Sequence, residues 1–302
     1  MVAPRGERTG RLPGCTGEMT ANLALEVYTV PTQPVVRPPE PPAPPGGWTW
    51  PPNTAALVYG ERDAVLVDTL VTTTEVTKLA DWIGARKRNL TTIYLTHDHV
   101  DHIAGAAVLL DRFPSARLVA LPAVAGSIRA QLATPIVDTY WRPMFHGDIV
   151  AELAVPEPLA DGRIELEGRE LTAAAVEQSD SVHSTYLHIP ELDALVVGDI
   201  AYNDVHVNVA STDHAKRLAW IGALRTIGAL NPGIVVAGHR RPDAQDTAQT
   251  IPDTIAYIAD FDDVLSQKLP AADTIAWMLQ RHPNRLNITT LYNAAYVLAS
   301  QD

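Results

Sequence analysis

Short apolar stretches alternate with polar segments along most of the chain, and their spacing predicts both strands and helices. The apolar segments 55–59 and 64–68 flank a polar Gly-Glu-Arg-Asp tetrapeptide, which predicts a β-hairpin. Thr72 and Glu75 form a capping box, so we expect a helix over 73–88. Four apolar positions of this segment share one helical face and should point to the core: Val76, Leu79, Ala80 and Ile83.

Comparable patterns continue to the end of the chain. Further strands are predicted at 21–30, 91–95, 117–121, 163–168, 170–177, 185–189, 194–199 and 233–239. Further helices are predicted at 103–113, 122–133, 211–229 and in most of the chain from Pro252 onward. In each half, strands come first and a mixture of strands and helices follows. This order predicts two packed sheets with helices outside them, a four-layer αββα sandwich of the α+β class.

Three regions follow from the composition along the chain. Residues 1–20 contain basic residues but lack the apolar core of a secretory signal, so we expect a disordered leader, with Met1 or Met19 as the true start. Residues 21–268 should form the main domain, and residues 269–302 a C-terminal helical extension. The extension is either a dimer arm or the last helices on the core, which leaves a homodimer open. A cytoplasmic location is expected.

A proline-rich segment interrupts the main domain at 31–53. Its ten prolines exclude a helix or a central strand. It is either a surface loop or a flap over a site, with Trp48 and Trp50 as apolar contacts.

Composition narrows the classes of function. The chain has 302 residues, of which 46 % are hydrophobic and 19 % charged, as in an ordinary globular protein. The net charge of −12 argues against a nucleic-acid partner, and no stretch approaches the length of a membrane span. A small-molecule substrate is therefore expected. With one cysteine, Cys15, a zinc site must use histidine and carboxylate ligands.

The chemistry is concentrated in the segment Thr96-His97-Asp98-His99-Val100-Asp101-His102. It follows a predicted buried strand and precedes a helix. His97 and His99 are two residues apart, so they face the same way in an extended segment. Asp101 and His102 follow where the chain turns. Such a loop can offer two ligands to one metal ion and two to a second ion close by.

Two further ligand candidates end apolar strands. Asp199 ends the stretch ALVVGD, and His239 ends GIVVAGH. A carboxylate buried there without a partner would be costly. Because strand ends meet along one edge of a sandwich, both residues can reach the histidine-rich loop.

These motifs resemble those of the metallo-β-lactamase fold superfamily, whose signature is H-x-H-x-D-H, a later histidine, an aspartate after an apolar strand and a last histidine. The likeness covers roughly residues 21–265 and is closest to an uncharacterised bacterial subgroup, through GDIAYNDVH and VVAGHRRP. It implies the αββα fold, a metal-dependent hydrolase, and a buried aspartate beneath the metal loop, which Asp68 matches.

The later histidine departs from the family pattern. Its expected position falls on Gln178, within Glu177-Gln178-Ser179-Asp180, and a histidine occurs only five residues later, at His183. Imidazole is the better zinc ligand, so we expect His183 to bind, with Gln178 as the alternative.

The resemblance implies two metal sites that Asp199 bridges. One would use His97, His99 and His183, and the other Asp101, His102 and His239. This set suits two zinc ions, with iron or manganese as other candidates. The expected reaction is attack of a metal-bound hydroxide, held at Asp101 and Asp199, on a small ester, lactone, thioester or amide.

Two alternatives on the same fold are a mononuclear iron oxygenase and a small-molecule phosphodiesterase. Two residues after Asp199 could also serve the reaction. Tyr202 is a candidate for polarising the substrate oxygen, and His206 either lines the pocket or lies on the surface.

Overall fold

The computed structural model describes residues 22–37 and 41–300, so the predicted leader at 1–20 lies outside the described residues. The first sheet contains, in order across it, β1 (Ala24–Val30), β4 (Asn53–Tyr59), β5 (Asp63–Val67), β6 (Asn89–Tyr94), β7 (Arg117–Ala120) and β8 (Glu157–Pro158). The second contains β13 (Ile234–Arg240), β12 (Ala194–Asn203), β11 (Thr185–Ile189), β10 (Arg169–Ala175) and β9 (Arg163–Leu166). A small ribbon pairs β2 (Gln33–Pro34) with β3 (Thr49–Trp50).

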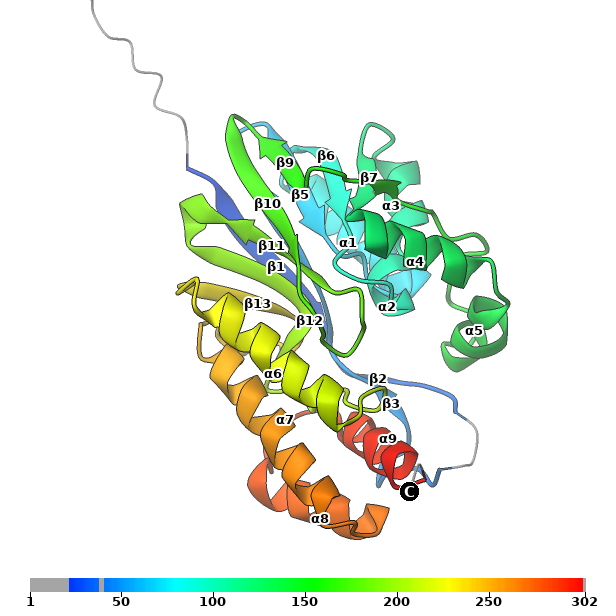
Figure 1. Ribbon diagram of the computed structural model, residues 1–302. Helices are drawn as coiled ribbons and strands as arrows, with labels where there is room; N and C mark the ends of the chain where they lie inside the picture. Colours follow the sequence, from blue (N-terminus) through cyan, green and yellow to red (C-terminus); the bar gives the residue numbers. More distant parts are fainter. Residues whose placement is uncertain (1–21, 38–40, 301–302) are drawn as a thin grey trace, which may run out of the picture.

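The helices lie outside the two sheets, as the sequence predicts (Figure 1). On the first sheet lie α1 (Thr73–Ala85), α2 (Val100–Ile103), α3 (Ala106–Arg112) and α4 (Pro122–Leu132), followed by α5 (Arg142–Met144). On the second sheet lie α6 (His214–Gly228) and α7 (Thr250–Ser266), and α8 (Ala271–Arg281) and α9 (Ile288–Ala299) pack against them. A π-helical turn covers Val137–Trp141, and a 3-10 turn covers Pro190–Leu192. The four-layer sandwich is therefore confirmed.

Alternation along the strands produces these layers. In β4, Leu57 packs toward the first helical layer, whereas Val58 packs between the sheets. In β12, Val196 packs between the sheets and Val197 packs toward α6 and α7. Successive side chains of a strand point to opposite faces, so a strand buried on both faces reads as a continuous apolar run.

The predicted first helix forms with its cap. The Thr72 hydroxyl accepts from the Glu75 backbone N–H at 3.3 Å, and the four predicted apolar positions are buried. The predicted helix at 103–113 differs, because it begins earlier as α2 and is interrupted at Gly105 before α3. The early start places Asp101 and His102 on the first turn of α2.

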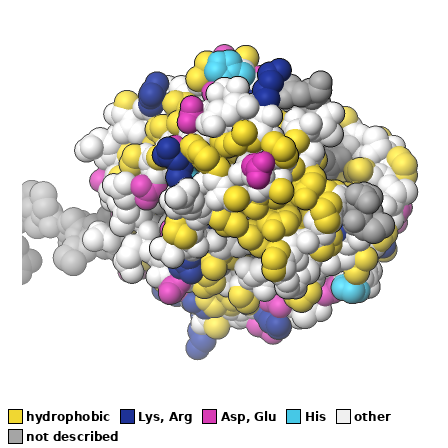
Figure 2. Space-filling model, turned by 90° about the horizontal axis from the view of Figure 1, so that it is seen from below, with side chains coloured by type: hydrophobic (Ala, Val, Ile, Leu, Met, Phe, Trp, Pro, Cys, Tyr) yellow, Lys and Arg dark blue, Asp and Glu magenta, His cyan; other side chains and the backbone are white. Residues whose placement is uncertain are grey.

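The C-terminal helices join the core of the second sheet. Met278 of α8 and Leu291 of α9 belong to the same hydrophobic cluster as Trp220 of α6 and Phe261 of α7. The face of the molecule below these helices carries a broad group of hydrophobic side chains (Figure 2). Among the described residues, none of the helices is long and apolar enough to cross a membrane.

Candidate metal centre

The histidine-rich loop lies at the carboxyl end of β6, where the chain passes into α2. His97 and His102 are fully buried, and His99 immediately precedes the helix. The rings of His97 and His102 lie 4.3 Å apart between centroids, and those of His97 and His99 lie 4.7 Å apart. The loop thus gathers three imidazoles at one point, as its spacing predicts.

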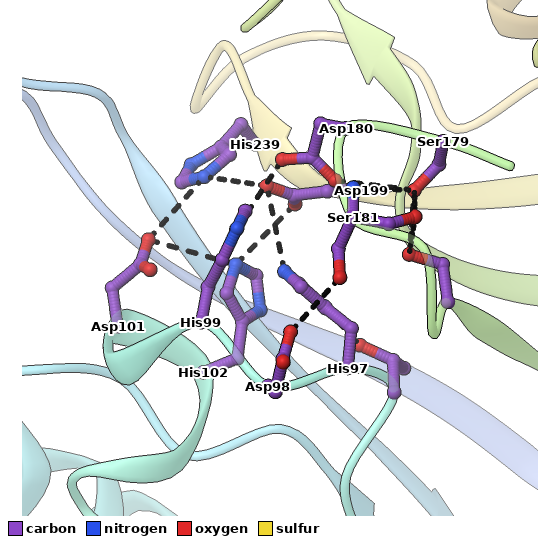
Figure 3. Close-up of polar contacts among 12 residues, drawn as sticks. His97, Asp98, His99, Asp101, His102, Ser179, Asp180, Ser181, Asp199 and His239 are labelled. Carbon is purple, nitrogen blue, oxygen red and sulfur yellow. Dashed lines mark hydrogen bonds and ion pairs between the residues drawn. The ribbon is translucent and has the colours of Figure 1, made fainter. Parts of the chain in front are cut away.

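Three acidic or imidazole side chains from other segments meet this loop (Figure 3). Asp199 comes from β12, His239 from β13, and Asp180 from the connection between β10 and β11. Asp199 Oδ1 lies 3.3 Å from His102 Nε2, and Asp199 Oδ2 lies 3.1 Å from His239 Nε2. Asp199 in the middle of β12 and His239 near the carboxyl end of the parallel strand β13 therefore converge on the loop. The predicted end of the strand at Asp199 is wrong, because β12 continues to Asn203.

Two adjoining groups of ligand atoms lie in the cluster, beside a third combination of Asp68, His97 and His102 that shares its histidines with them. The first group contains His97, His99, Asp180 and Asp199, and the second contains Asp101, His102 and His239. Within each group, one ligand atom from every residue lies within 4.8 Å of all the others. Because Asp199 also contacts His102 and His239, its carboxylate lies between the groups.

The acidic and imidazole groups of the cluster shift the pKa values of one another. Burial disfavours the charged form of Asp199, but His239 and His102 outweigh burial and hold the pKa of its carboxyl well below the usual range. Burial likewise opposes the proton on His239, yet Asp199 and Asp101 raise the pKa of this imidazole to about 10. His97 behaves differently, because burial and the adjacent His102 lower its pKa to about 4. The Asp199 carboxylate therefore remains ionised, and metal binding must displace a proton from His239, whereas the His97 imidazole is already neutral.

Three buried polar atoms show that a metal ion suits the cluster. Nε2 of His97, Nε2 of His102 and Oδ1 of Asp199 make no hydrogen bond with any described residue. An unpaired buried donor or acceptor costs about 1–3 kcal/mol. These atoms are nitrogen and oxygen donors of the kind that zinc, iron and manganese take, so bound metal would satisfy all three.

Neighbouring groups fix the orientation of the imidazoles. His102 Nδ1 donates to Asp68 Oδ2 at 2.9 Å, and His239 Nδ1 donates to the Pro52 carbonyl at 2.7 Å. Each contact places the ring proton on Nδ1 and leaves the Nε2 lone pair facing the other ligands. Asp68 therefore lies beneath the loop, where the resemblance places it.

Two glycines let the strands approach the cluster closely. A Cβ atom on Gly238 would lie 2.4 Å from Asp199 Oδ1 and 2.7 Å from His102 Cε1. A Cβ atom on Gly198, which has a φ of +50°, would lie 2.4 Å from Thr96 Oγ1. Any larger residue at either position would displace a ligand or the loop.

Comparison with known proteins agrees with this geometry. The sequence profile described as "Metallo-beta-lactamase superfamily" matches residues 48–239, which include all seven residues of the two groups. The chain belongs to the metallo-beta-lactamase superfamily.

Relatives and solved structures support the membership. A hydroxyacylglutathione hydrolase of Parasynechococcus marenigrum (strain WH8102) is 28 % identical over 155 residues, or 51 % of this chain and 48 % of the relative. The chain thus matches about half the length of that relative. A metallo-beta-lactamase family protein from Thermus thermophilus has a TM-score of 0.58 at 21 % identity, and the match covers 89 % of this chain and 92 % of that protein. A metallo-beta-lactamase from Pontibacter korlensis has a TM-score of 0.57 at 16 % identity, and the match covers 78 % of this chain and 100 % of that protein. These two similarities concern the fold.

At the place where the superfamily pattern expects a later histidine, the structure brings Asp180 into the first ligand group. His183 is exposed and lies outside the ligand groups, so the expectation that it binds is corrected. The alternative, Gln178, is buried and donates its side-chain N–H to the Ser179 carbonyl at 2.6 Å. Asp180 Oδ2 instead lies 3.3 Å from His99 Nδ1.

A hydrogen-bonded turn directs Asp180 inward. The Ser179 hydroxyl lies 2.5 Å from the Ser184 hydroxyl, and the Ser181 hydroxyl donates to Asp98 Oδ1 at 2.9 Å. Asp98 also accepts from Ser127, so it ties this turn and α4 to the metal loop. The only sequence signal was an acidic residue next to the expected ligand position.

Tyr202 reaches the centre, but His206 does not. Tyr202 Oη lies 2.9 Å from Asp199 Oδ2 and 3.1 Å from Asp180 Oδ2, so its single proton is shared between two carboxylates. His206 is buried against Tyr257, whose hydroxyl lies 3.0 Å from its Nδ1, and it lines neither the ligand groups nor the cavity. The expectation that His206 faces the substrate or the surface is therefore wrong.

A cavity of about 210 Å³ opens over the ligand groups. Trp50 and Trp141 form an aromatic wall, and α9 and its preceding residue form a polar wall through Asn287, Thr289, Thr290 and Asn293. Trp50 also donates to Asp101 Oδ2 at 3.1 Å. The proline-rich segment thus contributes to the cavity and to the metal centre, and the C-terminal helix closes the other side.

Proposed function

We propose that this protein is a dinuclear zinc hydrolase that acts on a small ester, lactone, thioester or amide. The observation that carries the proposal is the presence of two adjoining ligand groups, with Asp199 between them and with three buried ligand atoms that make no hydrogen bond with the described residues. A single metal ion would leave one of these groups unused. The second group therefore disfavours the mononuclear iron oxygenase.

In this proposal, His97, His99 and Asp180 hold one ion, Asp101, His102 and His239 hold the other, and Asp199 is shared. Bound zinc would supply Lewis-acid polarisation of the substrate oxygen and a water whose pKa is lowered to about 7. Iron or manganese would be accepted by the same nitrogen and oxygen donors.

The chain itself orients these groups and limits the substrate. Tyr202 holds a proton between Asp199 and Asp180 and so keeps both carboxylates in place. Trp50 and Asn53 both donate to Asp101 Oδ2, at 3.1 Å and 3.3 Å. The cavity of about 210 Å³ suits a small molecule and not a polymer. Similarity to a hydroxyacylglutathione hydrolase favours a thioester among the acyl substrates.

A panel of esters, lactones, thioesters, amides and one phosphodiester, bis(4-nitrophenyl) phosphate, tests the proposal. We expect zinc-loaded protein to cleave at least one acyl substrate, with the activity lost on chelation and restored by zinc. The Asp199→Ala variant should lose that activity, and the exposed His183→Ala should keep it. Cleavage of the phosphodiester alone, or acyl cleavage that chelation leaves intact, would contradict the proposal.

A further inference from the structure

One basic side chain stands apart in the lining of the cavity. The centre contributes His99, Asp101, Asp199 and His239, and most other lining residues are uncharged. Among the described residues that line the cavity, Arg37 is the one arginine or lysine. It belongs to the proline-rich segment, whose sequence indicated only a loop or an apolar flap.

Arg37 is held in place at the mouth of the cavity. Its guanidinium carbon lies 4.9 Å from the centroid of the Trp48 ring, and its Nη2 donates to the Tyr140 hydroxyl at 3.2 Å. Tyr140 is exposed, which places this pair at the rim. The backbone that precedes Arg37 is held by two hydrogen bonds, since Val35 N–H donates to the Trp48 carbonyl and Val36 N–H donates to the Met144 carbonyl, each at 3.0 Å.

The guanidinium retains donors for a ligand. No carboxylate of the described residues lies within salt-bridge distance of Arg37, and Tyr140 is its one hydrogen-bond acceptor among them. A guanidinium carries five N–H donors in a fork that matches a carboxylate. Four other arginines of the described residues pair with glutamates: Arg86, Arg117, Arg163 and Arg169. With respect to the described residues, Arg37 is therefore an oriented cation with donors left for a ligand, and it lines the space over the metal centre.

The overall charge makes this local cation important for an anionic substrate. The chain carries a formal charge of −12, so its general field repels anions. At the centre, the three carboxylates of Asp101, Asp180 and Asp199 would be outweighed by the four charges of two divalent ions. An anionic substrate would thus meet positive charge at the metal centre and at Arg37.

We propose that Arg37 binds a carboxylate of the substrate, so that the acyl compound hydrolysed at the centre is a small carboxylic acid derivative. This assignment rests on the proposed hydrolase function for its catalytic part. The carboxylate would accept from the Arg37 fork, Tyr140 would keep the fork in place, and the scissile carbonyl would lie toward Asp199 and His239. The cavity length thereby selects short substrates with an acidic end.

A matched pair of thioesters isolates the charge. We would compare the N-acetylcysteamine thioesters of glutaric acid and of its monoamide, which differ only in a terminal carboxylate or carboxamide. Wild-type protein should show a kcat/KM for the glutaryl thioester at least tenfold above that for the amide. In Arg37→Gln this ratio should fall close to one, and in Arg37→Lys it should be intermediate, because lysine keeps the charge without the fork.

A control and a third substrate sharpen the test. Arg129→Gln removes an exposed arginine of α4 that does not line the cavity, so its ratio should match that of the wild type. A thioester ending in a phosphonate instead of the carboxylate distinguishes the two kinds of anion. A ratio that survives in Arg37→Gln, or a tenfold preference for the phosphonate, would overturn the assignment of a carboxylate to Arg37.

A binding measurement separates this proposal from the proposed activity. Calorimetry with glutarate and with its monoamide, on zinc-treated protein, reports the Arg37 site even if no thioester is cleaved. Wild-type protein should bind glutarate at least tenfold more tightly than the monoamide, and Arg37→Gln should bind the two equally. Equal binding by the wild type would overturn the Arg37 assignment, whereas preferential binding without hydrolysis would overturn only the hydrolase.

Discussion

Asparagine in place of Asp68 should weaken metal binding, although the role assigned to Asp68 is to orient His102. Asp68 lies beneath the loop, 2 % exposed, and its two oxygens accept from three donors: Thr96 N–H at 2.9 Å, the Thr96 hydroxyl at 2.8 Å and His102 Nδ1 at 2.9 Å. Its backbone has a φ of +60°, a left-handed conformation that asparagine also tolerates. Asp68→Asn therefore changes the hydrogen bonding and leaves the backbone unstrained.

The expected magnitude follows from the tautomer of His102. If the new amide oxygen keeps the Thr96 N–H, the amide nitrogen faces Nδ1 of His102 and donates to it. The ring proton then moves to Nε2, the atom that lies 3.3 Å from Asp199 and faces the proposed metal. Loss of such an orienting contact typically lowers metal affinity by about 10–100-fold. Since 1.4 kcal/mol corresponds to a factor of ten, this is about 1.4–2.8 kcal/mol.

A zinc titration against a chromophoric chelator measures this affinity. Asp98→Asn is a matched control, because it makes the same charge change in the metal loop that Asp68 supports. The partners of Asp98 are the hydroxyls of Ser127 and Ser181, which can donate or accept. The control should stay within about threefold of the wild type. An Asp68→Asn affinity equal to that of the wild type, with circular dichroism showing an intact fold, would refute the role assigned to Asp68.

Three further predictions concern the centre, its surroundings and the core. Gly238→Ala should lower zinc affinity by more than tenfold without removing a ligand. Gly126 has open space around it, so Gly126→Ala should leave zinc affinity unchanged. Equal affinities of the two variants would contradict the close approach of Gly238 to Asp199 and His102. Burial, with help from Arg285 and His282, lowers the pKa of His206 to about 3, so the unfolded chain binds an extra proton below about pH 6.5. As the pH is lowered from about 6 to about 4, the wild type should therefore lose up to about 1.4 kcal/mol of unfolding free energy per pH unit more than His206→Gln. Urea unfolding in the presence of chelator measures both proteins, and the same loss of unfolding free energy in both would exclude this. Phe261→Ala in α7 should cost about 3–5 kcal/mol of unfolding free energy, against less than about 0.5 for the exposed Leu218→Ala, and a small loss at Phe261 would place it outside the core.

Local sequence patterns predicted the layers and most of the centre, because each depends on residues close in the chain. Alternation decides which layer each side chain of β4 or β12 faces, and the spacing of His97, His99 and His102 decides that the loop gathers imidazoles. Asp199 and His239 were predictable because each belongs to an apolar strand of one parallel pair, although β12 continues beyond Asp199.

Long-range contacts decide what the sequence did not predict. Asp180 turns inward because its turn is tied to Asp98, which lies more than eighty residues earlier. His206 is buried because its backbone N–H donates to the Leu286 carbonyl of the C-terminal segment at 3.0 Å. The polar wall of the cavity requires Thr49 to meet Asn287, at 2.7 Å between Oγ1 and Oδ1. Such pairings have no local pattern.

The zinc content of the purified protein tests the central claim most directly. Elemental analysis would compare the wild type with Asp180→Ala and with His183→Ala after zinc loading and removal of free metal. Two zinc ions per chain are predicted for the wild type and for His183→Ala, and about one for Asp180→Ala. One zinc ion or none in the wild type would contradict a dinuclear centre. Loss of zinc from His183→Ala, with both zinc ions kept in Asp180→Ala, would contradict the role of Asp180 in completing it.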